Sequence, residues 1–110
     1  MPALRHDGRL TRAARSHTLG MLRTNTFSHG NMAARLERFG IRRGRVGENL
    51  AWGAGTYASA QSIVRMWLAS PSHRANLLRP GFRRIGLGAA VGAFEGYDGA
   101  MVVTADFQGT

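Results

Sequence analysis

The sequence lacks cysteine, lysine and long apolar runs. Without cysteine, the 110-residue chain has no disulfide framework, no cysteine-ligated zinc site and no thiol nucleophile. No stretch comes near the roughly 18 consecutive apolar residues that a transmembrane helix needs. The start of the chain also lacks the apolar segment of a signal peptide. Because 44% of the residues are hydrophobic, we predict one globular domain with a single core.

Acidic residues are also few. All 15 basic residues are arginines and only six residues are acidic, so the formal net charge is +9. Such a charge favours anionic partners, namely nucleic acid, phospholipid headgroups or acidic cell-wall polymers. Four arginines that lie close together could bind phosphates or simply face the solvent: Arg38, Arg42, Arg43 and Arg45. The alternation of aromatic and basic residues that single-strand binders use is not seen.

Helical patterns dominate the first two thirds of the chain. Apolar residues recur at helical spacing over residues 10–22, where Asp7 or Thr11 could cap the start, and again over residues 57–69. Shorter helices are predicted at residues 31–39, which a glycine follows, and at 72–78, which a proline precedes.

Extended segments dominate the last third. Strands are predicted at residues 84–91 and 101–107, joined by a glycine-rich turn over residues 92–99, and a short extended segment is predicted earlier, at 46–53. Since helices come first and a hairpin last, the order predicts an α+β fold rather than a parallel α/β sheet.

Histidines and a few acids are the residues that could carry chemistry. His29 and His73, together with Glu48, match the ligand types of an open zinc site, and they could equally supply a general acid and base. Their spacings of 19 and 25 residues form no local metal motif, however. Spacing alone therefore does not join the three residues in one site.

Five motifs, in order along residues 10–109, carry a family resemblance. They are Phe27-Ser28-His29, Gly47-Glu48-Asn49-Leu50-Ala51-Trp52-Gly53, Trp67-x-x-Ser70-Pro71-x-His73-Arg74-x-Asn76-Leu77-Leu78, Gly86-Leu87-Gly88 and Val103-Thr104-Ala105-Asp106-Phe107. The set resembles the CAP superfamily of cysteine-rich secretory, antigen 5 and plant pathogenesis-related proteins. Within it, the chain is similar to the short, cysteine-free bacterial branch.

The resemblance implies a three-layer α-β-α sandwich with a small, mostly antiparallel sheet, in one domain over residues 1–110. It implies an extracellular protein, and a chain that lacks part of the family's first helix, so that some core would be exposed. It also implies a cleft of two histidines and two acids that binds zinc or another divalent cation in some members. His29, Glu48 and His73 take three of these positions, whereas the second acid has no clear counterpart and the strand histidine of animal and plant members falls near Val102.

Other residues near these motifs are candidates for ligand contact: Asn49, Tyr57, Ser70, Arg74 and Asn76. The asparagines and the arginine could instead hold the backbone and the helix that follows Pro71. His17 lies on a core-facing helical stripe and is predicted to be a packed, hydrogen-bonded histidine. A serine–histidine hydrolase is disfavoured, because no serine lies in a Gly-x-Ser-x-Gly elbow and serines at helix starts are usually caps.

Three functions remain open. The favoured one is a secreted, non-enzymatic module that presents a cleft and a basic surface to a lipid, a cell-wall polymer or a protein. The second is a hydrolase in which His29, Glu48 and His73 hold a divalent cation that polarises water. The third is a binder of nucleic acid or another polyanion through charge, although we expect an anionic cell-surface polymer, a lipid or a protein before nucleic acid.

Overall fold

The computed structural model describes residues 3–109, which form four α-helices and four strands. Along the chain these are β1 (Arg5–His6), α1 (Gly8–Thr24), α2 (Met32–Arg38), β2 (Val46–Gly53), α3 (Ala60–Ala69), α4 (Pro71–Leu78), β3 (Phe82–Phe94) and β4 (Tyr97–Gly109). A short 3₁₀ turn, Gly55–Tyr57, follows β2. The predicted α+β class is confirmed.

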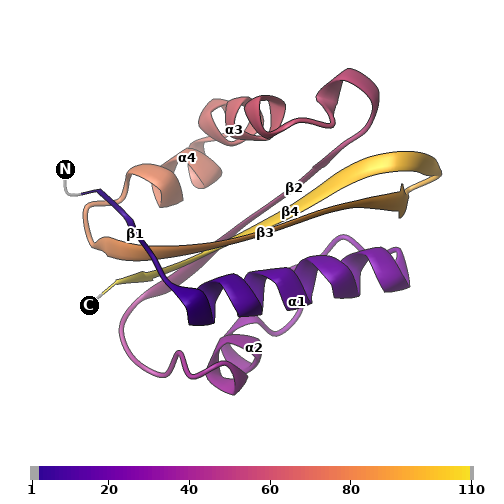
Figure 1. Ribbon diagram of the computed structural model, residues 1–110. Coiled ribbons are helices and arrows are strands. Elements are labelled where there is room, and N and C mark those ends of the chain that lie inside the picture. The colour runs from indigo at the N-terminus through magenta and orange to yellow at the C-terminus, as the bar shows by residue number, and fades with distance from the viewer. Residues whose placement is uncertain (1–2, 110) are drawn as a thin grey trace.

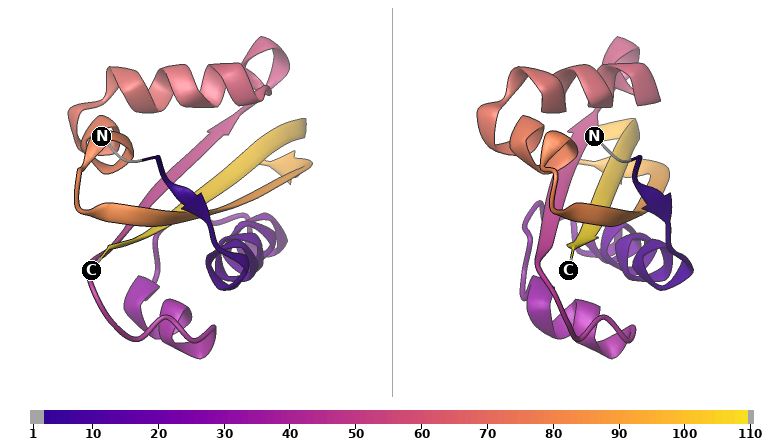
Figure 2. Two further views of the ribbon diagram at one scale, coloured as in Figure 1. Left: turned by 60° about the vertical axis from the view of Figure 1, so that its left-hand side comes forward. Right: turned by 90° about the vertical axis from the view of Figure 1, so that its left-hand side faces the viewer.

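The sheet lies between two helical layers. Its strand order is β1-β3-β4-β2, with β1 parallel to β3 and the other neighbours antiparallel. Helices α3 and α4 lie over one face of the sheet, and α1 and α2 lie over the other, as Figure 1 and the turned views of Figure 2 show. The α-β-α sandwich with a mostly antiparallel sheet is therefore confirmed.

Helix α1 is fixed at both ends by its sequence. The carboxylate of Asp7 accepts hydrogen bonds from the backbone N–H groups of Arg9 (2.9 Å) and Leu10 (3.2 Å), so Asp7, not Thr11, is the N-cap. The helix ends at Asn25, which takes the left-handed conformation with φ of 51°. Between these ends, the apolar stripe packs on the sheet and is almost completely buried: Leu10, Ala13, Ala14 and Met21.

Helix α1 lies directly against the backbone of β3, because β3 presents glycines to it. A Cβ atom at Gly86 would overlap the backbone of Leu10 and Thr11, and one at Gly88 would overlap the backbone of the next helical turn. The Gly86-Leu87-Gly88 motif therefore has a packing reason, the close approach of a helix to a strand.

Helix α3 begins later than the predicted start at residue 57. Residues 55–57 form a separate 3₁₀ turn, and the side chain of Ser59 caps the helix at the N–H of Ser62. The buried face of α3 carries Trp67, whose indole N–H donates to the backbone carbonyl of Leu50 in β2 (3.0 Å). This side of the sheet holds the largest core cluster: Ala51, Ile63, Trp67, Phe82, Val103, Ala105 and Phe107.

The long turn predicted at residues 92–99 is wrong. Strands β3 and β4 run on through most of that segment and are joined by Glu95 and Gly96 alone. Both residues have positive φ, 51° and 85°, as a two-residue type I′ hairpin requires. Strand β1 was not predicted, because two residues are too few to show a pattern.

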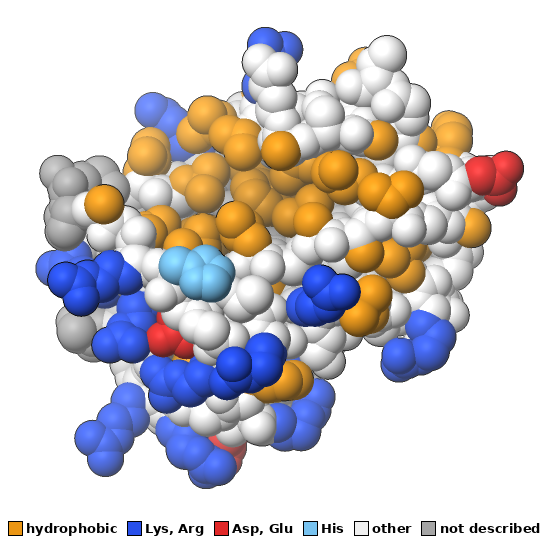
Figure 3. Space-filling model, viewed as in Figure 1, with side chains coloured by type: hydrophobic (Ala, Val, Ile, Leu, Met, Phe, Trp, Pro, Cys, Tyr) orange, Lys and Arg blue, Asp and Glu red, His pale blue; other side chains and the backbone are white. Residues whose placement is uncertain are grey.

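Within the described residues, strand β3 has an unpaired edge over most of its length, and some of its apolar side chains are exposed. Its pairing with β1 ends at Ile85, and no other strand in the described part of the chain lies along that edge. The side chains of Leu87 and Val91 are exposed to solvent. Figure 3 shows hydrophobic side chains gathered across this side of the molecule, between the upper helices and the sheet. The expectation that part of the family's first helix is missing, with core exposed as a result, stays a prediction, as does the extent of the natural domain.

The close packing of α1 on β3 is testable with one methyl group. We expect Gly86→Ala to lower the free energy of unfolding by about 3 kcal/mol or more, because the added carbon would force the helix away from the strand. Chemical denaturation measures this change. Gly99→Ala is the matched control, since a Cβ there meets open space. Equal stabilities of the two variants would show that the helix does not lie on the strand as described.

Candidate functional site

Glu48 lies in β2, on the face of the sheet that α1 and α2 cover, and its side chain is only 1% exposed. Its Oε1 is 2.8 Å from Nδ1 of His29, which comes from the loop between α1 and α2. Because a carboxylate can only accept, Nδ1–H is the donor. The His29 ring is 54% exposed, which leaves its Nε2 edge toward solvent. Two of the three residues of the predicted cleft are thus in contact.

Arg35 of α2 completes this contact, and the sequence analysis missed it. Its Nη2 donates to Oε2 of Glu48, and its Nη1 donates to the backbone carbonyl of His29 at 3.2 Å. One buried guanidinium therefore links a helix, a loop and a strand. A signal was present in the sequence, because Arg35 stands on the same helical stripe as Met32 and Phe39, where a basic residue needs a buried partner.

Asp106 is a second acid in this cluster, and it was not among the predicted site residues. It lies in β4 directly opposite Glu48 in the antiparallel pairing, is fully buried, and is 3.8 Å from Nη2 of Arg35. Two ionised carboxylates in this position would repel each other. In addition, neither oxygen of Asp106 accepts a hydrogen bond. An ionised Asp106 would therefore be buried without a hydrogen bond, with Arg35 as a partly compensating charge that it shares with Glu48.

Protonation of Asp106 resolves this conflict. Burial, a hydrogen bond to Glu48 and the charge of Glu48 raise the pKa of Asp106 to about 9, against the opposing charge of Arg35. Burial also raises the pKa of Glu48, whereas the hydrogen bond from Asp106 and the charge of Arg35 act against that rise. At neutral pH, Asp106 therefore keeps its proton and donates it to Glu48, which faces Arg35 as a carboxylate.

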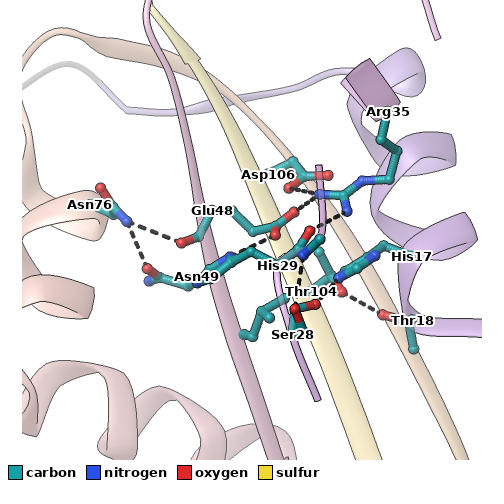
Figure 4. Close-up of polar contacts among 12 residues, drawn as sticks. His17, Thr18, Ser28, His29, Arg35, Glu48, Asn49, Asn76, Thr104 and Asp106 are labelled. Carbon is teal, nitrogen blue, oxygen red and sulfur yellow. Dashed lines mark hydrogen bonds and ion pairs between the residues drawn. The ribbon is translucent and has the colours of Figure 1, made fainter. Parts of the chain in front are cut away.

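Figure 4 shows this cluster and the polar groups beside it. His17 of α1 is half-buried, and its Nε2 donates to the backbone carbonyl of Ser28 at 2.6 Å, so the predicted packed histidine is confirmed. Burial, followed by the charge of Arg35, lowers the pKa of His17. On the same face, Thr18 and Thr104 share a buried hydrogen bond of 2.8 Å that ties α1 to β4.

His73 is not part of the cluster. It lies on α4, above the opposite face of the sheet, and its Nδ1 is 3.0 Å from Oγ of Ser70. The side chains of a strand alternate between faces, so Glu48 points to one side while Asn49 points to the other and donates to the backbone carbonyl of His73 (3.0 Å). Within residues 3–109, no three His, Asp or Glu side chains lie close enough to hold a metal ion.

The residues present do not fit a zinc ion held jointly by His29, Glu48 and His73. Both oxygens of Glu48 are already in contact, one with His29 and one with Arg35. The guanidinium supplies the positive charge that a metal would otherwise bring, and displacing it would leave a buried cation without a partner. Metal binding at these three residues stays a prediction, and the arrangement gives it no ready site.

Two adjoining hollows lie along the outer edge of β2, and together we call them the β2-edge pocket. The first, of about 260 Å³, is lined by Phe27, Leu50, Ala51, Trp52, Met66, Trp67, Ser70 and His73. The second, of about 420 Å³, shares Trp52 and Met66 and adds Gly53, Ala54, Tyr57 and Tyr97. The pocket therefore contains His73 and two of the other predicted residues, Tyr57 and Ser70.

The remaining candidates have other positions. Asn49 is fully buried, and its side-chain oxygen accepts from Nδ2 of Asn76 (2.9 Å), which also donates to the backbone carbonyl of Glu48 (3.3 Å). These amides hold α4 on β2, as the alternative interpretation proposed, and Asn49 has no surface for a ligand. Arg74 lines a separate hollow between α3 and α4.

The α-β-α fold and the order of its motifs define the class of protein. A family model described as "CAP: Cysteine-rich secretory protein family" matches residues 1–107, so the chain belongs to the CAP family. None of the helices in the described residues has the length and apolar character needed to cross a membrane.

Bacterial proteins are among its relatives. YkwD of Bacillus subtilis (strain 168) is 34% identical over 90 residues, which cover 77% of this chain and 34% of YkwD. The crystal structure of an extracellular SCP-domain protein from Bacillus anthracis superposes with a TM-score of 0.82 at 29% identity, over all of this chain and 35% of that one. An outer surface protein of Borrelia burgdorferi shares the fold, with a TM-score of 0.78 at 20% identity over all of this chain and 80% of that one. The chain thus spans about a third of the first two relatives.

The proton on Asp106 predicts a pH dependence of stability. Its pKa is about 9 in the folded protein against an ordinary 3.8, so between these values the folded state holds a proton that the unfolded state has lost. The free energy of unfolding therefore falls as pH rises through this window. Between about pH 5 and 8, we expect it to fall more steeply in the wild type than in Asp106→Asn, by up to about 1.4 kcal/mol per pH unit.

Urea denaturation at several pH values measures both slopes. The exposed Asp98→Asn is the matched control and is expected to keep the wild-type slope, because it changes the same functional group outside the cluster. If Asp106→Asn also keeps that slope, the assignment of the proton to Asp106 is wrong.

Proposed function

We propose that this protein is an extracellular or cell-surface binding module that holds the apolar part of an amphipathic ligand, such as a lipid, in the β2-edge pocket. The observation that carries the proposal is the pair of adjoining hollows along β2, whose size is in the range of small-molecule sites and whose lining is mainly apolar and aromatic. The descriptions of an extracellular and an outer-surface relative support the location.

The walls of this pocket are formed before any ligand arrives. Trp52 packs against Phe94 and Tyr97, with ring centroids 5.6 and 5.8 Å apart, and Phe27 packs edge-on against Phe94 at 6.4 Å. Tyr57 is 64% exposed, so a bound apolar chain would remove much of its surface from water. Preformed aromatic walls reduce the ordering cost of binding.

Polar groups lie toward one end of the pocket. Ser70 and His73 are hydrogen-bonded to each other there, whereas Trp52 and Met66 form the apolar middle that both hollows share. A sugar polymer would require many hydrogen-bonding groups along the walls. The observed division favours a ligand with an apolar chain and one polar end, and among the partners considered from the sequence we therefore choose the lipid.

The pocket can be tested with palmitate as the probe. We expect wild-type protein to bind it with a change in tryptophan fluorescence, and Tyr57→Ser combined with Met66→Ser to weaken binding by at least about tenfold, since two apolar contacts are lost. Leu19→Ser, an exposed apolar residue on α1, is the control and is expected to bind like the wild type. No binding by the wild type, or equal loss in the control, would contradict the proposal.

A hydrolase is the second candidate, and one observation favours it. A buried carboxylate holds Nδ1 of His29 and leaves Nε2 toward solvent, which is how a general base is oriented. However, the neighbouring Ser28 is not placed as a nucleophile, because its Oγ accepts from the N–H of Gly30. A metal-activated water is also poorly supported, since His73 lies apart from Glu48. The binding module is therefore the proposal that we favour.

Zinc titration distinguishes the two candidates. We expect dialysed protein to show no tight, stoichiometric zinc site in isothermal calorimetry, because Arg35 already occupies one oxygen of Glu48. His29→Ala and His73→Ala are then expected to behave like the wild type. One tight zinc ion per chain that is lost in both variants would contradict this account and would support the metal-dependent hydrolase.

A further inference from the structure

Another hollow, of about 300 Å³, lies away from the β2-edge pocket and is lined by arginines. We call it the arginine hollow; its lining is Arg9, Arg43, Gly44, Arg83, Arg84, Gln108 and Gly109. Gln108 is opposite Val46 at the start of β2, whereas the pocket residue Trp52 is near the other end of the strand. Figure 3 shows basic side chains gathered on this lower left part of the molecule, near the C-terminus.

Three of the four arginines of this hollow, Arg9, Arg83 and Arg84, are held in place by contacts of their guanidinium groups. Asp7, itself almost buried, contacts Nη1 of Arg84 at 2.9 Å and Nη2 of Arg9 at 3.4 Å. Arg9 also donates from Nη1 to the backbone carbonyl of Gly40 (3.2 Å), and Arg83 donates to the backbone carbonyl of Pro80. Side chains that are already ordered lose less conformational entropy when they bind a ligand.

The arginine hollow carries more positive charge than the carboxylates in contact with it neutralise. Four arginines line it and no acid does; within residues 3–109, Asp7 is the one carboxylate in contact with any of them, so three positive charges remain. The neighbouring Arg42 differs, because it pairs with Glu37 at 3.6 Å. Guanidinium groups form paired, charge-assisted hydrogen bonds with phosphate and carboxylate oxygens. A single carboxylate would neutralise one of the three charges, whereas a phosphate monoester carries about −1.5 to −2.

We propose that the arginine hollow is a binding site for a phosphate-bearing anion. The phosphate oxygens would accept from Arg43 and Arg83, with Arg9 and Arg84 held behind by Asp7. Such phosphate is available both free in solution and on phospholipid headgroups, and the chemistry is shared between these sources. The site uses none of the residues of the β2-edge pocket, so the two proposals can fail separately.

Inorganic pyrophosphate is the probe for this site. By isothermal calorimetry at constant low ionic strength, we expect the wild type to bind it, and Arg43→Gln combined with Arg83→Gln to bind at least about tenfold more weakly, because two charge-assisted contacts are lost. Arg23→Gln combined with Arg65→Gln is the matched control. This control lowers the net charge by the same amount as the hollow pair. Because both of its positions are exposed and lie outside the hollow, binding is expected to stay within about twofold of the wild type.

Vesicles distinguish the two sources of phosphate. Sedimentation with phosphatidylcholine vesicles that contain phosphatidylglycerol, relieved by pyrophosphate, would support the site with a lipid headgroup as its ligand. Pyrophosphate binding without sedimentation would support the site with a soluble phosphate. The proposal is overturned if the wild type does not bind pyrophosphate, or if the control pair loses as much affinity as the hollow pair, which would show that net charge alone acts. Melting temperatures establish that both double variants are folded.

Discussion

The buried contact between Arg35 and Glu48 is the interaction on which the other features of the site depend. It joins α2 to β2 and, through the backbone carbonyl of His29, fixes the loop that carries Phe27 into the wall of the β2-edge pocket. Burying ions costs desolvation energy, so such a contact adds little net stability compared with an apolar pair of the same shape. Its effect here is positional, because the guanidinium determines where the loop lies against the sheet.

The polar cluster and the β2-edge pocket lie in different parts of the fold. His29, Glu48, Arg35 and Asp106 occupy the face under α1 and α2, where a shared proton leaves one negative charge for one guanidinium. The β2-edge pocket lies along the border of the sheet, and side chains of α3 and α4 form part of its lining. Under the proposed function, the histidine and the acid that the family resemblance emphasised would be parts of the scaffold, and the aromatic side chains beside them would form the binding surface.

The sequence predicted the long helices well because their apolar spacing is set by local geometry. It failed at residues 92–99, where glycines suggested a loop but Glu95 and Gly96 alone make the turn. Arg35 and Asp106 were missed because each stands inside an otherwise apolar pattern, and only tertiary packing shows that they meet. The grouping of His73 with Glu48 depended on distance in space. The number of residues between His73 and Glu48 does not tell whether they lie over the same face of the sheet or over opposite faces.

The protonation state of the Asp106 carboxyl can be observed directly. Carbon-13 NMR of the side-chain carboxyl, followed through a pH titration of labelled protein, reports its protonation without altering the cluster. The account predicts that Asp106 remains protonated at neutral pH and titrates near the pKa of about 9. A signal that shows an ionised carboxylate throughout the neutral range would contradict it, and would mean that Arg35 faces two negative charges.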